Sequence, residues 1–454
     1  MPLPLPLVPF ERYILADDRP AYPMNFQIRL QLIGQVQPGA MQAAFSGAAS
    51  RHPLLAACVA GKGKSLCWVP AEMPELDWLP APPPLGCPPA RPLDLRQEPG
   101  LKGWAWQDGD QSELVLQIHH AVADGLGGFR FVEDLLVCYD AALKGKMPFT
   151  TLEPLDPKLL VRRAQPRISR LDFFKTLPVQ LDGLARGRDF LLHRALPLTP
   201  ASVAHALDEP SQPFPAVIYG VLSADEATAH WEAARRLGVT PNDLFARDLF
   251  LSLASWRSQR YPGRTRGWYR LSVPVSLRRE EDERMPAANM VGMVLLDRRE
   301  REMSSPAALL RGIHAEMQRV KRHDLAVAFL FSLQVLAAIP GMLARVTRPS
   351  RCAATALFTN LGDPLERTPL SSTSTGHLSA GNAVLRSLYA PAPVRPYTSA
   401  ALSIVRYAGQ LFFALTYDPR AISPDDAESL WQEFFQRVHD SGRLAGSAHL
   451  GSIA

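Results

Sequence analysis

Two adjacent histidines followed by an aspartate and a glycine are the residues of this chain best suited to chemistry. His119 and His120 end the apolar run Leu114–Ile118, and Asp124-Gly125 follows three apolar residues later. A neutral imidazole in a sheltered cleft is a good general base near pH 7, and a carboxylate nearby can fix the turn that orients the ring. Side chains alternate along a strand, so only one imidazole can face a given cleft. The pattern predicts one basic histidine and one that packs or forms hydrogen bonds.

Acyl transfer is a reaction that such a base can catalyse without a covalent intermediate. The histidine takes a proton from a hydroxyl or amine while that group attacks a thioester, and the sulfur leaves readily. The sequence gives no support to a serine or cysteine nucleophile, because it has no GxSxG motif and no cysteine in an activating context. Adjacent strand histidines point apart and there is no HExxH helix, so we expect no metal site.

The elements around the motif predict α/β packing. The run before the histidines is apolar on both faces, which favours a strand inside a sheet. A helix is expected from the Asp-Gly pair to about Lys144, and an earlier strand and helix over Phe26–Leu32 and 38–51. The 454 residues suffice for two lobes of about 200 residues each. The proline-rich stretch Leu196–Pro215 lacks apolar periodicity, so we place lobes at 1–200 and 215–454.

The second lobe has clear signals of its own. Ser223 and Thr240 predict the N-caps of two helices, strands are expected over Trp268–Val275 and Val291–Leu296, and a last helix begins near Ser423. Ala401–Tyr407 and Leu411–Tyr417 flank Ala408-Gly409 as a hairpin. The apolar stretch Leu325–Ala344 is interrupted by Pro340-Gly341, which favours a buried or interfacial helical pair over a membrane span.

The pattern HHxxxDG resembles the superfamily of thioester-dependent acyltransferases with a chloramphenicol acetyltransferase-like fold. Its members include condensation domains of peptide synthetases, polyketide-associated acyltransferases and wax ester synthases. The resemblance extends along the chain through five further segments: Pro92-Leu93-Asp94-Leu95, Thr240-Pro241-Asn242-Asp243, Val273–Arg278, Asn289–Gly292 and Thr359–Pro364. It implies two sheet-and-helix lobes with a substrate tunnel between them.

The resemblance also implies roles for individual residues. His120 is the general base, His119 packs beside it, and Asp124 is structural, with Arg278 of the second lobe as its partner. Gly125 leaves room for a substrate arm near the backbone. Asn289 and Asn360 are expected to line the tunnel. No cofactor is expected to be resident, and the co-substrate is acyl-CoA or an acyl group on a phosphopantetheine arm.

The expected function is transfer of an acyl group from CoA or a carrier protein to a hydroxyl or amine, with ester formation on a lipid-like acceptor preferred. No carrier or adenylation segment is visible, so we expect a stand-alone enzyme. The alternatives are a non-catalytic module that docks a carrier protein, and an amide-forming, cyclising or epimerising enzyme that uses the same His120. The glycerolipid acyltransferase motif HxxxxD matches only when counted from His119, and it leaves the two-lobe pattern unexplained.

Charge and cysteine usage limit the partners and the compartment. The net charge is +5, and the segment Val161–Arg194 carries eight basic and three acidic residues interleaved with apolar ones. That segment is interpreted as a solvated helical face, with an acidic partner or anionic lipid as alternatives. No nucleic-acid module is present. Five cysteines without paired spacing and an N-terminus without a secretory signal predict a cytoplasmic protein, with peripheral contact at the inner membrane left open.

Overall fold

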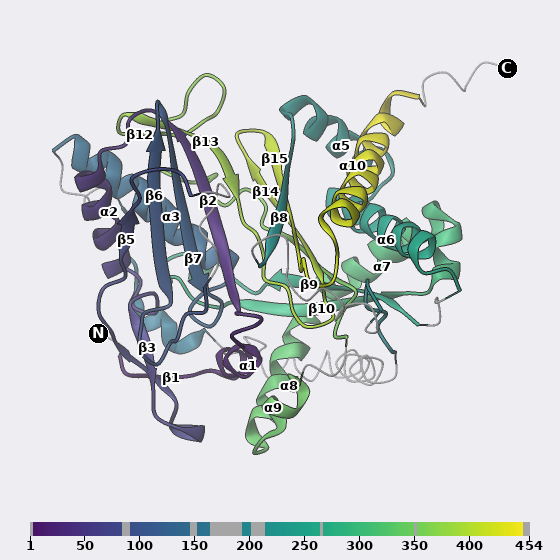
Figure 1. The fold of residues 1–454 in the computed structure, drawn as a ribbon, viewed down its shortest axis with the longest axis horizontal. Helices are drawn as coiled ribbons and strands as arrows, with labels where there is room; N and C mark the ends of the chain where they lie inside the picture. The colour runs from purple at the N-terminus through teal and green to yellow at the C-terminus, as the bar shows by residue number, and fades with distance from the viewer. Residues whose placement is uncertain are drawn as a thin grey trace.

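The protein forms two lobes that lie side by side (Figure 1). The computed structural model describes residues 3–83, 91–145, 152–163, 193–200, 214–263, 267–348 and 352–447. Over these residues the strands form two six-stranded sheets, one in each lobe, and a third sheet of three strands. The predicted α/β class with two lobes of sheet and helix is confirmed.

The strand that carries the histidines lies inside the first sheet, as its apolar sequence predicts. The strand order is β12 (Ser379–Ala380), β13 (Ala383–Tyr389), β2 (Asn25–Ile33), β7 (Gln111–His119), β6 (Leu101–Asp108) and β5 (Leu76–Trp78). β7 pairs antiparallel with both β2 and β6. Its residues Leu114–His119 are all buried. A strand with neighbours on both edges holds the residues after it in a fixed place.

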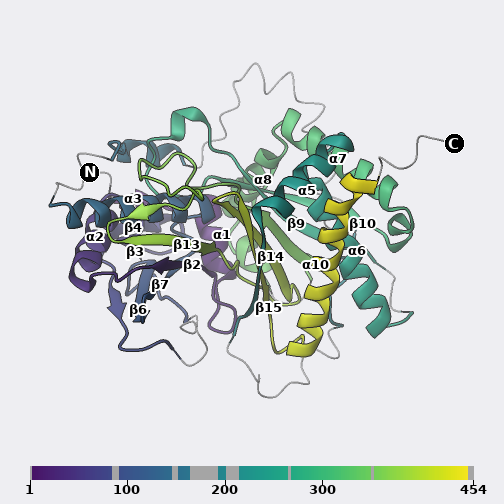
Figure 2. The ribbon, with the colours of Figure 1, turned by 90° about the horizontal axis from the view of Figure 1, so that it is seen from above.

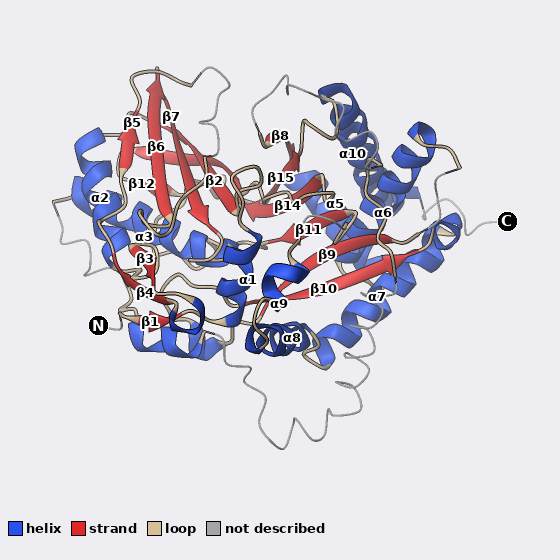
Figure 3. Ribbon diagram, turned by 60° about the horizontal axis from the view of Figure 1, so that its bottom comes forward, coloured by secondary structure: helices blue, strands red, loops and turns tan. Residues whose placement is uncertain are grey.

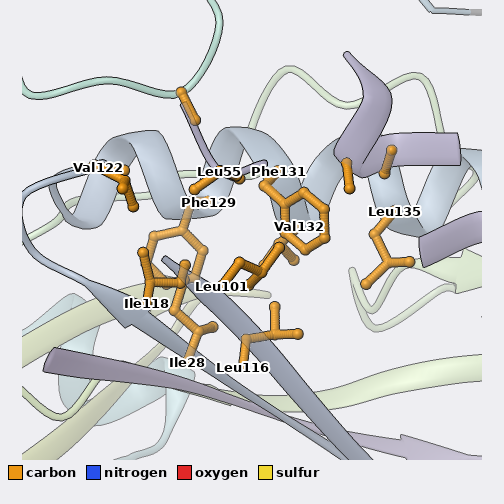
Figure 4. Packing of buried hydrophobic residues seen from close by; sticks show 14 of the residues in the cluster. Ile28, Leu55, Leu101, Leu116, Ile118, Val122, Phe129, Phe131, Val132 and Leu135 are labelled. Carbon is orange, nitrogen blue, oxygen red and sulfur yellow. The ribbon is translucent and has the colours of Figure 1, made fainter. Parts of the chain in front are cut away.

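Two helices cover one face of this sheet: α2 (Pro38–Ser50) and α3 (Gly125–Leu143). Phe129, Val132 and Leu135 of α3 point toward Ile118 and Leu116 of the sheet (Figure 4). This apolar contact anchors the helix that begins directly after the histidine turn. The rest of the lobe contains β1 (Leu5–Pro6), α1 (Pro9–Asp17), β3 (Ala57–Ala60) and β4 (Cys67–Pro70).

The second lobe repeats the arrangement. Its sheet has the order β10 (Val291–Arg298), β9 (Tyr269–Ser276), β11 (Ala356–Asn360), β14 (Ala400–Tyr407), β15 (Gln410–Tyr417) and β8 (Ala216–Leu222). The helices α5 (Ala224–Arg236), α6 (Pro241–Arg260), α7 (Pro306–Arg322) and α10 (Pro424–Ser447) gather on the outer side of the lobe (Figure 2). Ser223 and Thr240 cap α5 and α6 as predicted, each within a capping box.

The apolar stretch of the second lobe forms the predicted helical pair, α8 (Ala326–Ala338) and α9 (Met342–Val346). α8 packs against α1 of the first lobe and β10 of the second, so it lies where the lobes meet (Figure 3). Among the described residues, no helix is both long and apolar enough to cross a bilayer.

The lobes do not divide as cleanly as the expected ranges 1–200 and 215–454. β12 and β13 belong to the first sheet, where β13 pairs with β2. Conversely, Leu196 and Leu198 are buried in the core of the second lobe. Apolar alternation identifies a strand but does not specify which sheet edge it pairs with, and β2 would otherwise expose an open edge. The basic segment Val161–Arg194 falls largely on residues 164–192, outside the described part of the chain.

Candidate active site

The histidine pair lies where β7 ends, and the two rings face different surroundings. His120 N–H donates to Met24 O at 2.7 Å, and His119 N–H donates to Gly100 O at 2.8 Å. His119 is fully buried, and its Nδ1 accepts from Ala121 N–H at 3.0 Å. His120 keeps part of its surface exposed. The structure therefore separates a packed histidine from one that can meet a substrate.

Aromatic rings surround His120. Phe26 of β2 and Phe10 of α1 meet its ring edge-on, with centroids 5.3 and 6.2 Å away. Phe329 of α8, from the second lobe, packs on Phe10 in turn. Burial lowers the pKa of His120 below its ordinary value, outweighing the opposing attraction of Asp124. The ring is neutral at pH 7 and can accept a proton, and its Nδ1 has no hydrogen-bond partner among the described residues.

Asp124 links the two lobes. Its carboxylate caps α3 by accepting from Gly127 N–H at 2.8 Å. Arg278, just after β9, donates to both of its oxygens at 2.8 Å, and Met290 N–H donates at 2.7 Å. The ion pair expected from the sequence is present. The partners of the carboxylate are thus Gly127, Arg278 and Met290, which fix the turn that follows His120.

Asn289 supports the backbone of the same turn. Its Nδ2 donates to His120 O and Ala121 O, both at 2.9 Å. Asn289 is buried at 3% exposure. The structure thus brings Asn289 to the site, where its amide holds the backbone of the histidine turn.

Asn360 forms hydrogen bonds with residues outside the histidine turn. Its Nδ2 donates to Asn242 Oδ1 at 2.5 Å, and its Oδ1 accepts from Gly362 N–H at 2.9 Å. These bonds tie the end of β11 to the start of α6. The next residue does reach the site, because a Cβ added at Gly125 would lie 2.7 Å from Leu361 Cδ2. The space beside Gly125, expected to receive a substrate arm, is filled here by Leu361.

The sequence pattern missed the aromatic neighbours of His120. Phe26 begins a strand that was expected from the sequence. Pairing that strand with the histidine strand would have placed Phe26 opposite Ile118 and so near His120. Phe10 has none, because α1 is short and its position is set by tertiary packing. Across the described residues, no group of three or more His, Cys, Asp or Glu side chains is placed to hold a metal ion.

Comparison with known proteins agrees with this geometry. Residues 287–438 match the family described as the WS/DGAT C-terminal domain. The fold is similar to the epimerization domain from the third module of tyrocidine synthetase B, with TM-score 0.69 and 13% identity over 98% of this chain and 97% of that one. No curated protein matches the chain in sequence.

Two further solved structures are similar over nearly their whole length. The starter condensation domain of rhizomide synthetase RzmA, a mutant in complex with C8-CoA and Leu-SNAC, gives TM-score 0.66 and 16% identity over 98% and 95% of the two chains. The SgcC5 protein from Streptomyces globisporus gives TM-score 0.66 and 15% identity over 96% and 98%.

The chain therefore has the two-lobe fold of the chloramphenicol acetyltransferase-like superfamily, and the resemblance read from its motifs is confirmed. Within that fold, residues 287–438, most of them in the second lobe, are similar to the WS/DGAT C-terminal domain, and the whole chain shares its fold with condensation domains.

Proposed function

We propose that this protein transfers an acyl group from a CoA or carrier-protein thioester to a hydroxyl or amine acceptor, with His120 as the general base. The observation that carries the proposal is a neutral, partly exposed imidazole at the lobe junction. The turn that holds it is fixed from the second lobe by Arg278 and Asn289. A base in this state is ready to accept a proton at physiological pH.

The reaction balances without any further reagent. The acceptor oxygen or nitrogen attacks the thioester carbonyl carbon while its proton passes to His120. The tetrahedral intermediate collapses, the carbon–sulfur bond breaks, and the protonated imidazole returns the proton to the departing thiolate. Because a thiolate is a good leaving group, alignment of the reactants supplies much of the rate.

We further propose that the acceptor is lipid-like. Phe10 and Phe26 give His120 apolar neighbours, and the second lobe matches a wax ester synthase and diacylglycerol acyltransferase family. Peripheral membrane contact is part of the same proposal. Val335 of α8, Ile339 between α8 and α9, and Val346 of α9 are 63%, 45% and 45% exposed, so three exposed large apolar side chains lie within twelve residues of one helical pair.

The test is turnover of the purified protein with octanoyl-CoA and a panel of acceptors: a long-chain alcohol, a diacylglycerol and an amino acid thioester. Free thiol release and product mass are measured together. His120→Ala should lose turnover by about 100-fold or more, while His323→Ala, a change outside the site, should not. Equal turnover of wild type and His120→Ala would overturn the proposal.

The same assay separates the alternatives. A docking module would release no thiol with any donor yet bind an acylated carrier protein unchanged after His120→Ala. An epimerising enzyme, the activity named for the tyrocidine synthetase neighbour, would leave the mass of the thioester unchanged and exchange its α-hydrogen with deuterated water.

A further inference from the structure

A second histidine–aspartate pair lies inside the first lobe, apart from the turn described above. His52 follows Arg51, the C-cap of α2, and is fully buried. Its Nε2 lies 3.1 Å from Asp134 Oδ2 of α3, and Asp134 also pairs with Arg51. Burial lowers the pKa of His52, so its ring is neutral. Against the opposing effect of burial, His52 and Arg51 together lower the pKa of Asp134.

The imidazole of His52 forms a hydrogen bond with the backbone of Ala287, which belongs to the second half of the chain. His52 Nδ1 accepts from Ala287 N–H at 2.9 Å, across 235 positions of sequence. A backbone N–H can only donate, so Nδ1 is unprotonated and Nε2 carries the proton. The Nε2–H lies close to Asp134 without satisfying hydrogen-bond geometry. Among the described residues, the side-chain hydrogen bond of His52 with good geometry is therefore the one to Ala287.

Ala287 opens the segment Ala287–Met290, which holds the catalytic turn. Ala288 O accepts from Arg278 at 2.8 Å, Asn289 donates to the turn, and Met290 N–H donates to Asp124. The segment belongs to no helix or strand, and Met290 O also accepts from Leu277 N–H at 2.8 Å. Its position is consequently set by these contacts, and His52 fixes its first residue.

The start of α3 makes the same segment sensitive to small shifts. A Cβ added at Gly127 would lie 2.8 Å from Ala288 O, so helix and segment are already in close contact. Movement of Ala287 would be transmitted to Asn289, two residues later, and thus to the carbonyl of His120.

We propose that His52 is a positioning residue for the reaction: its unprotonated Nδ1 anchors Ala287 and thereby sets Asn289 and the turn that carries His120. The inference rests on the proposed function, because its kinetic consequence is turnover that depends on His120.

Two substitutions test the contacts of Nδ1 and Nε2 of His52 separately. In His52→Asn the amide oxygen falls where Nδ1 stands and keeps an acceptor for Ala287, whereas the contact with Asp134 is lost. In His52→Gln the amide reaches toward Asp134 but leaves Ala287 N–H without an acceptor. Expected kcat is within about threefold of wild type for His52→Asn and about 10- to 100-fold lower for His52→Gln, with KM unchanged.

Hydrogen exchange of the peptide spanning 285–290 gives a readout without turnover. It should accelerate in His52→Gln and not in His52→Asn. Equal kcat and equal exchange in the two variants, after correction for the folded fraction, would overturn the inference and indicate a structural role alone.

If both variants unfold, the tautomer is measured by nitrogen NMR of the wild type, and a protonated Nδ1 refutes the proposal. If no turnover depends on His120, the proposed function fails, while the exchange measurement still decides the anchoring.

Discussion

Removal of Arg278 should weaken the junction between the lobes by a measurable amount. Arg278→Ala leaves the Asp124 carboxylate with the N–H groups of Gly127 and Met290 and no cation. Breaking a buried ion pair costs roughly 3–5 kcal/mol. Asp124 is 7% exposed and Arg278 is 23% exposed, so solvent screens part of the loss. The expected decrease in the free energy of unfolding is about 2–3 kcal/mol.

The neighbouring arginine provides the matched control. Arg279 is 45% exposed and lies 3.4 Å from Asp324, which is also exposed. Arg279→Ala removes the same charge and should cost less than about 0.5 kcal/mol. Arg278→Lys keeps the charge but not the two-pronged geometry and should fall between them. Guanidinium unfolding followed by tryptophan fluorescence measures all three, and equal midpoints for Arg278→Ala and Arg279→Ala would refute the reasoning.

Three further outcomes are expected. Burial, together with the positive charge of Arg247, lowers the pKa of His230 to about 4, so its stabilising effect is full above pH 6.5 and is lost as pH falls toward 4. In equilibrium unfolding, His230→Phe should remove about 3 kcal/mol of this pH dependence, and parallel curves would contradict it. Gly125→Ala should destabilise by about 1–3 kcal/mol through contact with Leu361; thermal melts should show recovery with Leu361→Ala, and failure to recover would exclude that contact as the cause. Val335→Asp with Ile339→Asp should lower flotation with anionic vesicles about tenfold or more, whereas unchanged flotation would rule out this surface.

Local signals in the sequence were sufficient for much of the fold. The capping boxes at Ser223 and Thr240 and the hairpin at Gly409 involve residues only a few positions apart, so their chemistry is visible in a short window. The pair Asp124–Arg278 spans 154 positions and was found through motif resemblance. Without that resemblance, Asp124 and Arg278 would each be interpreted as an ordinary charged residue at the surface.

The contacts that the sequence did not reveal are those formed between distant backbones. β13 joins β2 because that edge is open, and no residue of β13 encodes the choice. His52 has no partner nearby in sequence and gains Asp134 and Ala287 only after folding. Asn289 was placed near the site by motif resemblance, but its two hydrogen bonds to the backbone of the histidine turn depend on tertiary structure and could not be read from the sequence.

The hydrogen bonds of Asp124 bear on how His120 would act as the proposed base. In a serine protease triad, the carboxylate bonds to the imidazole and stabilises its protonated form. Here the carboxylate oxygens are occupied by Gly127, Arg278 and Met290, and burial holds the ring neutral. The imidazolium formed during attack gains less stabilisation than in a triad. A thioester tolerates this because its thiolate leaves easily and takes the proton back. For the proposed reaction we therefore expect thioester donors to be favoured over esters and amides, and a parallel assay with an octanoyl ester should give far lower turnover than octanoyl-CoA.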